Sequence, residues 1–376
     1  MKKVEVLDGV RGLAIILVMI YHFSLPFQHS EKTTWLDQFF YQILQTGWIG
    51  VDFFFALSGF LITAILISTR DNESYFKNFY VRRVLRIFPL YYGFLLFILV
   101  VFPYLSESYR LNTESMQENS FWFWTYLVNW KIAMLGSFNG FQGGYMWSLA
   151  VEEQFYLVWP LVVYYFHKKI PQISIITIAV MLVAKWVMLT KLGITATTIY
   201  VLPFTHLDAL LLGATLASLY MNGHLSHCVT RFFKPVAITA VLSLALLYFV
   251  EGRFVYNNNM IALIGLPLLG ILASCIISYL LVGKGQEKGN VFFKFFNNNV
   301  LRKFGVLCYG LYLFHQPIGV VINSKVIPYN AFELWGSYIP STLLSISLSI
   351  FVSYVVALLS FNIYEKPFLK LKKYFV

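Results

Sequence analysis

The sequence predicts an all-α fold, a polytopic bundle of membrane-spanning helices, and its composition is the first reason. Of its 376 residues, 59% are hydrophobic and 12% are charged, whereas a soluble domain is nearer half apolar and one quarter charged. The apolar residues also fall in long runs, which must be helical because hydrocarbon offers no partner for backbone N–H and C=O groups. Aromatic residues make up 19% of the chain, enough for belts at both membrane surfaces. These observations exclude a soluble globular enzyme, a disordered chain and a disulfide scaffold.

The apolar runs place about ten membrane-spanning helices along the chain, at roughly 20 residues each. Between the third and fourth spans, the segment 106–145 contains the aromatic run 121–124, which is too short to cross. That run is expected to lie at the lipid interface or to fold back into the bundle. Because no linker or repeat is evident, residues 1–376 are interpreted as one domain. The expected spans are 9–25, 49–68, 88–105, 146–166, 173–192, 202–221, 236–250, 260–282, 304–322 and 340–363.

The distribution of basic residues predicts the orientation. With the N-terminus in the cytoplasm, most of the 28 Lys and Arg residues fall in inner segments and few in outer ones, as the positive-inside rule requires. The net charge of +11 is therefore interpreted as a topology signal, and nucleic acid is not an expected partner. Both termini are expected in the cytoplasm, in a multi-pass protein of the plasma (inner) membrane surrounded by its lipids.

Ionisable side chains in the apolar runs are the first candidates for chemistry, because charge at membrane depth is costly and usually functional. The predicted topology puts six of them in the outer half of the bundle. Taken alone, Glu153 also fits a water-facing residue, and His315, just before Pro317, also fits a structural hydrogen-bond donor. The six are His22, Asp52, Glu152, Glu153, Asp208 and His315.

Arginines gather on the opposite, inner side. Arg82, Arg83 and Arg86 enter the third span at helical spacings that bring their side chains together, and Arg11 lies at the inner end of the first span. Such arginines are often topology anchors on lipid phosphate. A channel or a lipid anchor would not require acid–base groups outside and arginines inside. The three cysteines lack CxxC spacing, so neither a metal site nor a disulfide is expected.

These residues lie in motifs that resemble the acyltransferase 3 family of integral-membrane O-acyltransferases. The resemblance runs in order from about residue 4 to residue 368 and so covers nearly the whole chain. One departure is Phe314 and Gln316 around His315, where the family often has tryptophans, and it weakens any role carried over to His315. The matching motifs are Arg11 followed by His22 (Arg-x10-His), residues 50–62, residues 82–89, residues 147–160, residues 309–317 and residues 364–368.

The resemblance implies a reaction and its partners. Members of the family move acyl groups, commonly acetyl from acetyl-CoA, onto hydroxyls of glycans or related acceptors at the cell envelope. Many also carry an extracytoplasmic hydrolase-like domain. This sequence ends eight residues after the last motif, so no fused domain is expected, and the chain should transfer to the acceptor itself without a metal.

The residue chemistry suits that reaction. Arg82, Arg83 and Arg86 can form charge-assisted bonds to the phosphates of acyl-CoA, with Arg11 positioning the span end or touching the donor. His22 is the natural general base for the acceptor hydroxyl. Its orienting carboxylate is expected to be Glu152, with Asp52 as the rival. Glu152 is also expected to matter more than Glu153, and an acyl-His22 intermediate stays open.

Two other classes of protein remain as alternatives. A proton-coupled transporter of a small metabolite or glycan precursor would also use intramembrane carboxylates and histidines. Transporters often show matching broken helices in two halves, and no such symmetry is evident here. A non-catalytic membrane scaffold would leave the segregation of arginines and histidines unexplained.

Overall fold

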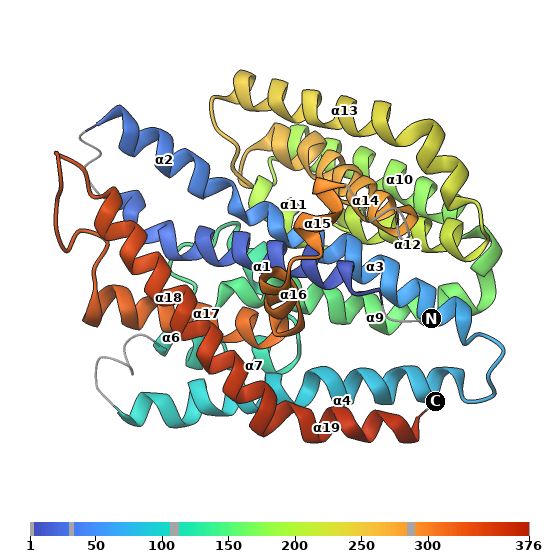
Figure 1. Ribbon diagram of the computed structural model, residues 1–376, viewed down its shortest axis with the longest axis horizontal. Helices are drawn as coiled ribbons and strands as arrows, with labels where there is room; N and C mark the ends of the chain where they lie inside the picture. Colours follow the sequence, from blue (N-terminus) through green and yellow to red (C-terminus); the bar gives the residue numbers. More distant parts are fainter. Residues whose placement is uncertain (1–3, 30–33, 106–112, 284–289, 376) are drawn as a thin grey trace.

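The computed structural model describes residues 4–29, 34–105, 113–283 and 290–375. In these residues the secondary structure is helical, with no strand beyond one isolated bridge between Leu334 and Ser337. The all-α prediction is therefore confirmed. Most of the long helices run along one direction, while α2 and α18 are inclined to it (Figure 1).

The chain contains both long helices and short ones. The first half contains α1 (Val6–Ser24), α2 (Trp35–Gln45), α3 (Gly50–Ser68), α4 (Tyr75–Leu96), α6 (Glu114–Glu118), α7 (Ser120–Trp124), α8 (Val128–Leu135), α9 (Trp147–Phe166) and α10 (Ile170–Thr190). The second half contains α11 (Ala196–Val201), α12 (Asp208–Met221), α13 (Leu225–Glu251), α14 (Leu266–Val282), α15 (Val291–Phe296), α16 (Asn299–Val306), α17 (Cys308–Val321), α18 (Ile339–Ser360) and α19 (Lys366–Leu371).

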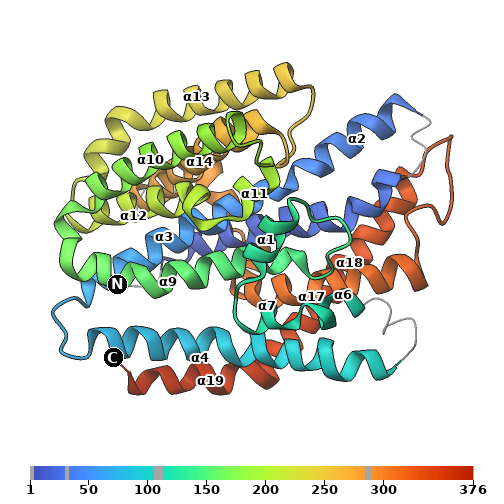
Figure 2. The ribbon, with the colours of Figure 1, turned by 180° about the vertical axis from the view of Figure 1, so that it is seen from behind.

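The helices that are long and apolar enough to cross a membrane are fewer than the spans expected from the sequence. Among the described residues, six helices are long and apolar enough to cross, or seven if α16 and α17, bent by 80°, form one broken span. The expectation of about ten spans is thus not confirmed. The expected spans 146–166 and 173–192 fall in one helical stretch, Gly144–Thr190, in which the chain turns back at the 3-10 helix His167–Lys169 (Figure 2). The expected spans 202–221 and 236–250 correspond to the apolar stretches Asp208–Met221 and Pro235–Glu251, each of fewer than 18 residues, the second being the part of α13 that begins at Pro235.

The two ends of the described chain lie at the same end of the bundle. In both views the start of α1 and the end of α19 are on one side (Figures 1 and 2). This arrangement agrees with termini that share one side of a membrane, while the assignment of that side to the cytoplasm stays a prediction.

The centre of the bundle is built on α3 and α12, which pack more extensively than any other pair. Glycines allow this approach. A Cβ on Gly59 would lie 1.9 Å from the backbone oxygen of Leu210, and one on Gly213 would lie 2.1 Å from that of Ala56. Small residues at such an interface bring helix backbones into direct contact. The contact fixes the start of α12 beside the N-terminal half of α3.

The aromatic run 121–124 folds back into the bundle, one of the two alternatives that the sequence left open. Phe123 is fully buried and stacks on Phe141 with ring centroids 5.8 Å apart. The hydroxyl of Tyr91 on α4 donates to the backbone oxygen of Phe123 at 2.8 Å. Only Phe121 remains largely exposed, at 63%. The segment after α7 is thereby held against the bundle and supplies one wall of the site described next.

Candidate active site

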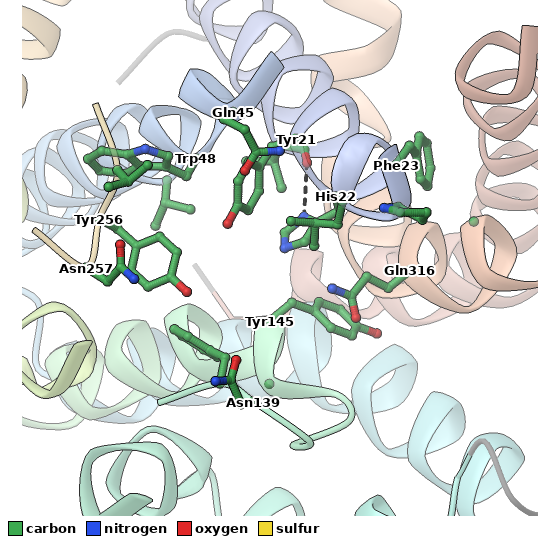
Figure 3. A pocket seen from close by; sticks show the side chains of 18 of the residues that line it. Tyr21, His22, Phe23, Gln45, Trp48, Asn139, Tyr145, Tyr256, Asn257 and Gln316 are labelled. Atoms are coloured by element: carbon green, nitrogen blue, oxygen red, sulfur yellow. Dashed lines mark hydrogen bonds between the residues drawn. The ribbon is translucent and has the colours of Figure 1, made fainter. Parts of the chain in front are cut away.

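A cavity of about 1320 Å³, called the chamber below, opens among α1, α2, α17, the segment 138–145 and the loop 253–258. Figure 3 shows its lining, in which aromatic rings and side-chain amides surround His22. Among the residues that the structure describes, no Asp or Glu lines the chamber. Burial raises the pKa of Tyr256, whose phenol therefore stays protonated and able to donate. These residue types suit sugars, whose C–H faces pack on aromatic rings while hydroxyls bond to amides.

One wall of the chamber is a single face of α2. Thr34 begins this helix with a capping box, in which its side chain accepts from the backbone N–H of Asp37 at 3.1 Å. The capping box gives hydrogen-bond partners to backbone N–H groups at the start of the helix, which have none within it. Gln38, Tyr41, Gln42 and Gln45 all line the chamber, because residues spaced by three, four and seven lie on one helix face.

His22 points into the chamber from α1 and is paired with His315 on α17. The Nδ1 of His22 lies 3.0 Å from the backbone oxygen of Val18 and 3.1 Å from the Nε2 of His315. The Nδ1 of His315 lies 2.7 Å from the backbone oxygen of Tyr312. In Figure 3, His22 faces the open space between Tyr145 and Tyr256.

This arrangement determines the tautomers. Carbonyl oxygens only accept, so the Nδ1 of His315 carries a proton and its Nε2 is the acceptor. The Nδ1 of His22 then carries the proton shared between Val18 and His315. The Nε2 of His22 is left with its lone pair and with no hydrogen-bond partner among the described residues. A neutral imidazole with this free nitrogen is the protonation state that a general base requires.

Two tyrosines that the sequence interpretation missed hold this pair in place. The hydroxyl of Tyr145 donates to the backbone oxygen of Leu313 at 2.8 Å, and the hydroxyl of Tyr312 bonds to the backbone oxygen of Tyr145. Ser148 on α9 lies 2.6 Å from the same Tyr312 hydroxyl. These bonds lock α17 to the start of α9, so that His315 is fully buried against His22. The available signal for Tyr312 was its position within the motif 309–317, whereas Tyr145 lies two residues before the motif 147–160.

Glu152 is not the partner of His22, which corrects the expectation drawn from the sequence. Its carboxylate accepts from the Ser58 hydroxyl at 2.7 Å and from the Tyr156 hydroxyl at 3.1 Å. It also interacts electrostatically with Arg83 and Arg86. Depth along a span gives no information about direction, and Glu152 faces the arginines instead of the chamber. The acceptor beside His22 is a histidine rather than a carboxylate.

Asp52 and Asp208 also lie outside the chamber lining. Asp52 lies 3.1 Å from the Nε2 of His206, and Lys185 donates to Asp208 at 2.6 Å, with all four side chains fully buried. His206 was assigned no role from the sequence. Its Nδ1 lies 2.5 Å from the backbone oxygen of Tyr200, so both of its ring nitrogens are engaged and neither is free to act as a base. Asp52 is therefore not the rival partner of His22.

The α4 arginines form a separate cluster. Arg83 lies over the ring of Tyr156 at 5.0 Å, and Arg82 donates to the backbone oxygen of Phe375 at 3.3 Å. No carboxylate of the described residues forms an ion pair with Arg82, Arg83 or Arg86. Glu153 acts on Arg83 electrostatically. Cations gathered without direct counter-ions are suited to bind an anionic ligand.

Arg11 is near this cluster but differs from it. It forms an ion pair with Asp8, one turn earlier on α1, at 2.8 Å. Arg11, Arg86 and Glu152 all act electrostatically on the buried Cys308, so the three side chains converge on the same region. A metal site was not expected, and the described residues contain no group of three or more His, Cys, Asp or Glu that would hold one.

Comparison with known proteins agrees with the motifs. The family model described as an acyltransferase domain matches residues 4–358. The peptidoglycan O-acetyltransferase OatA of Listeria monocytogenes is 28% identical, over 98% of this chain and 56% of that protein. The O-acetyltransferase OatA of Staphylococcus aureus is 29% identical, over 85% of this chain and 51% of that protein. The chain thus spans about half the length of the curated relatives it matches. No solved structure matches it. The ordered motifs, the helical membrane fold and this match over nearly the whole chain together establish that the chain belongs to the acyltransferase 3 family of membrane acyltransferases.

Proposed function

We propose that this chain is a plasma-membrane O-acyltransferase that moves an acetyl group from cytoplasmic acetyl-CoA to a hydroxyl of an envelope glycan. The observation that carries the proposal is the free Nε2 of His22 in a chamber lined by aromatic rings and amides. The relatives named as peptidoglycan O-acetyltransferases support a glycan acceptor. The reaction uses no metal.

Acetyl-CoA is the donor, and its phosphates are bound by Arg82, Arg83 and Arg86. These side chains fit a polyanion because none of them forms an ion pair with a carboxylate of the described residues. Glu152 and Ser58 both bond to the hydroxyl of Tyr156 and hold its ring in place. Arg83 lies over this ring and is positioned by it. Arg11, paired with Asp8, supports the neighbouring end of α1.

His22 is the general base. Its Nε2 removes the proton of the acceptor hydroxyl as the oxygen attacks the thioester carbonyl. The C–S bond breaks, the thiolate of CoA takes the proton from the imidazolium, and the products are the acetyl ester and free CoA. His315 is a positioning residue, because its Nε2 accepts from the Nδ1–H of His22 and holds the ring with Nε2 toward the chamber.

Reconstituted protein tests this function. The wild type in liposomes is supplied with radiolabelled acetyl-CoA on one side and a peptidoglycan oligosaccharide on the other. We expect ester-linked label on the sugar, and a loss of about 100-fold or more in His22→Ala. Thermal unfolding of the purified variant controls for folding. Transport of the sugar without label transfer would contradict the proposal and favour the transporter class.

A further inference from the structure

The loop 253–258 gives the chamber the strongly basic side chain of Arg253. Among the described residues that line the chamber, Arg253 is the only Lys or Arg, and none is an Asp or Glu. Arg253 is exposed, and an arginine at the edge of an otherwise uncharged cavity attracts anions toward it. In the predicted topology Arg253 is also one of the few basic residues on the outer side, where the positive-inside rule does not require one.

The loop that carries Arg253 is firmly held. Phe254, the next residue, stacks on Trp48 with ring centroids 5.4 Å apart and an interplanar angle of 12°. The indole N–H of Trp48 donates to the backbone oxygen of Phe254 at 3.2 Å. Arg253 therefore projects from an anchored backbone, and less entropy is lost when it binds a ligand.

Nothing among the described residues neutralises Arg253. The nearest carboxylate in sequence, Glu251, accepts instead from the amide of Asn258 at 2.6 Å. No ion pair of Arg253 occurs in the described chain. Arg253 does act electrostatically on Tyr41 of α2, which also lines the chamber, so its charge reaches the cavity.

We infer that the chamber selects a glycan bearing an anionic group, a carboxylate or a phosphate, and that Arg253 binds this group. The inference rests on the proposed function for the sugar itself and adds the charge that the sugar must carry. The guanidinium fork matches either oxyanion with two parallel hydrogen bonds. The anionic substituent is bound at the loop, and the uncharged sugar rings pack on the aromatic wall between Arg253 and His22.

Binding measurements on the full-length protein in detergent test the inference without requiring catalysis. Tryptophan fluorescence reports binding, since Trp48 and Trp147 line the chamber. The probes are a tetrasaccharide of alternating N-acetylglucosamine and N-acetylmuramic acid with free carboxylates, the same tetrasaccharide with these carboxylates amidated, and an N-acetylglucosamine tetramer carrying a 6-phosphate. The wild type is expected to bind an anionic probe about tenfold more tightly than the amidated one, and salt should reduce this ratio.

Three variants complete the test. Arg253→Gln should weaken binding of the anionic probes about tenfold and leave the amidated probe within twofold. Arg253→Lys should retain part of the discrimination, and Lys191→Gln, which removes an exposed cation outside the chamber lining, should change neither. Preference for the carboxylate or for the phosphate probe identifies the anion. Equal binding of all probes by the wild type, or equal weakening of all of them in Arg253→Gln, would overturn the inference. Discrimination in binding without acetyl transfer to any probe would overturn the proposed function alone.

Discussion

At the scale of single residues, the pairing of His22 with His315 sets the chemistry of the chamber. A carboxylate beside His22 would stabilise the imidazolium, whereas a neutral imidazole acceptor fixes the tautomer without adding charge to the membrane interior. His315 is itself fixed by the backbone oxygens of Tyr312 and Leu311, at 2.7 and 3.2 Å. The pair therefore supplies one available basic nitrogen in a fixed orientation.

Removing the acceptor on His315 should reduce turnover without affecting donor binding. We expect His315→Leu to lower kcat by roughly tenfold or more, because the His22 ring is then free to rotate, while KM for acetyl-CoA is unchanged. His315→Gln keeps an oxygen acceptor and should recover part of the rate. Steady-state kinetics with labelled acetyl-CoA measures both values. A leucine variant with wild-type kcat would remove His315 from the mechanism.

At the scale of elements, buried charges connect helices rather than serve the chamber. Lys185 on α10 bonds to Asp208 at the first position of α12, and Asp52 on α3 bonds to His206, which precedes α12. The ring of His206 stacks on Trp147 of α9 with centroids 5.6 Å apart. The start of α12 is thus tied to three neighbouring helices, and two of them, α3 and α9, provide part of the chamber wall through Val51 and Trp147.

The pair of Lys185 and Asp208 gives a stability prediction. Lys185→Met leaves Asp208 buried without its partner, and we expect a loss of about 3–5 kcal/mol. Removing both charges, in Lys185→Met with Asp208→Leu, should recover much of this loss because no unpaired charge remains. Chemical unfolding of the detergent-solubilised variants measures the difference. If the single variant is as stable as the wild type, the pair does not hold α10 to α12.

At the scale of the whole molecule, the two polar regions are separate. The chamber is built by α1, α2, α17 and the loops beside them, while the arginine cluster lies on α4, next to α19 and to the last residues of the described chain. Glu152 belongs to the second region. A donor held by the arginines and an acceptor held in the chamber would therefore approach His22 from different parts of the bundle.

This separation predicts different kinetic effects for the two regions. Arg86→Gln should raise KM for acetyl-CoA by roughly tenfold, because one charge-assisted contact is lost, and should leave KM for the glycan unchanged. The 3′-dephospho form of acetyl-CoA is the matched control substrate, since a variant that has lost a contact to that phosphate no longer distinguishes the two donors. Equal changes in both KM values would mean that the arginines act only on the fold or on lipid.

The sequence by itself determined the helical membrane class, the family and the residue types of both polar regions. These properties follow from apolar runs, from motif order and from the identities of the arginines and histidines, all of which are local in the chain. It also named His22 as a candidate general base, and this role stays a proposal.

Only the tertiary structure decided which ionisable groups meet. The sequence favoured Glu152 as the neighbour of His22, with Asp52 as the rival, because depth along a span leaves the direction of a side chain open. The 3.1 Å contact with His315, the bonds of Glu152 to Ser58 and Tyr156, and the pairing of Asp52 with His206 depend on helix rotation and on close packing such as that of Gly59 against Leu210. The expected ten spans were likewise not confirmed, because hydropathy measures apolar length, whereas the turning, bending and shortening of helices are set by their packing partners.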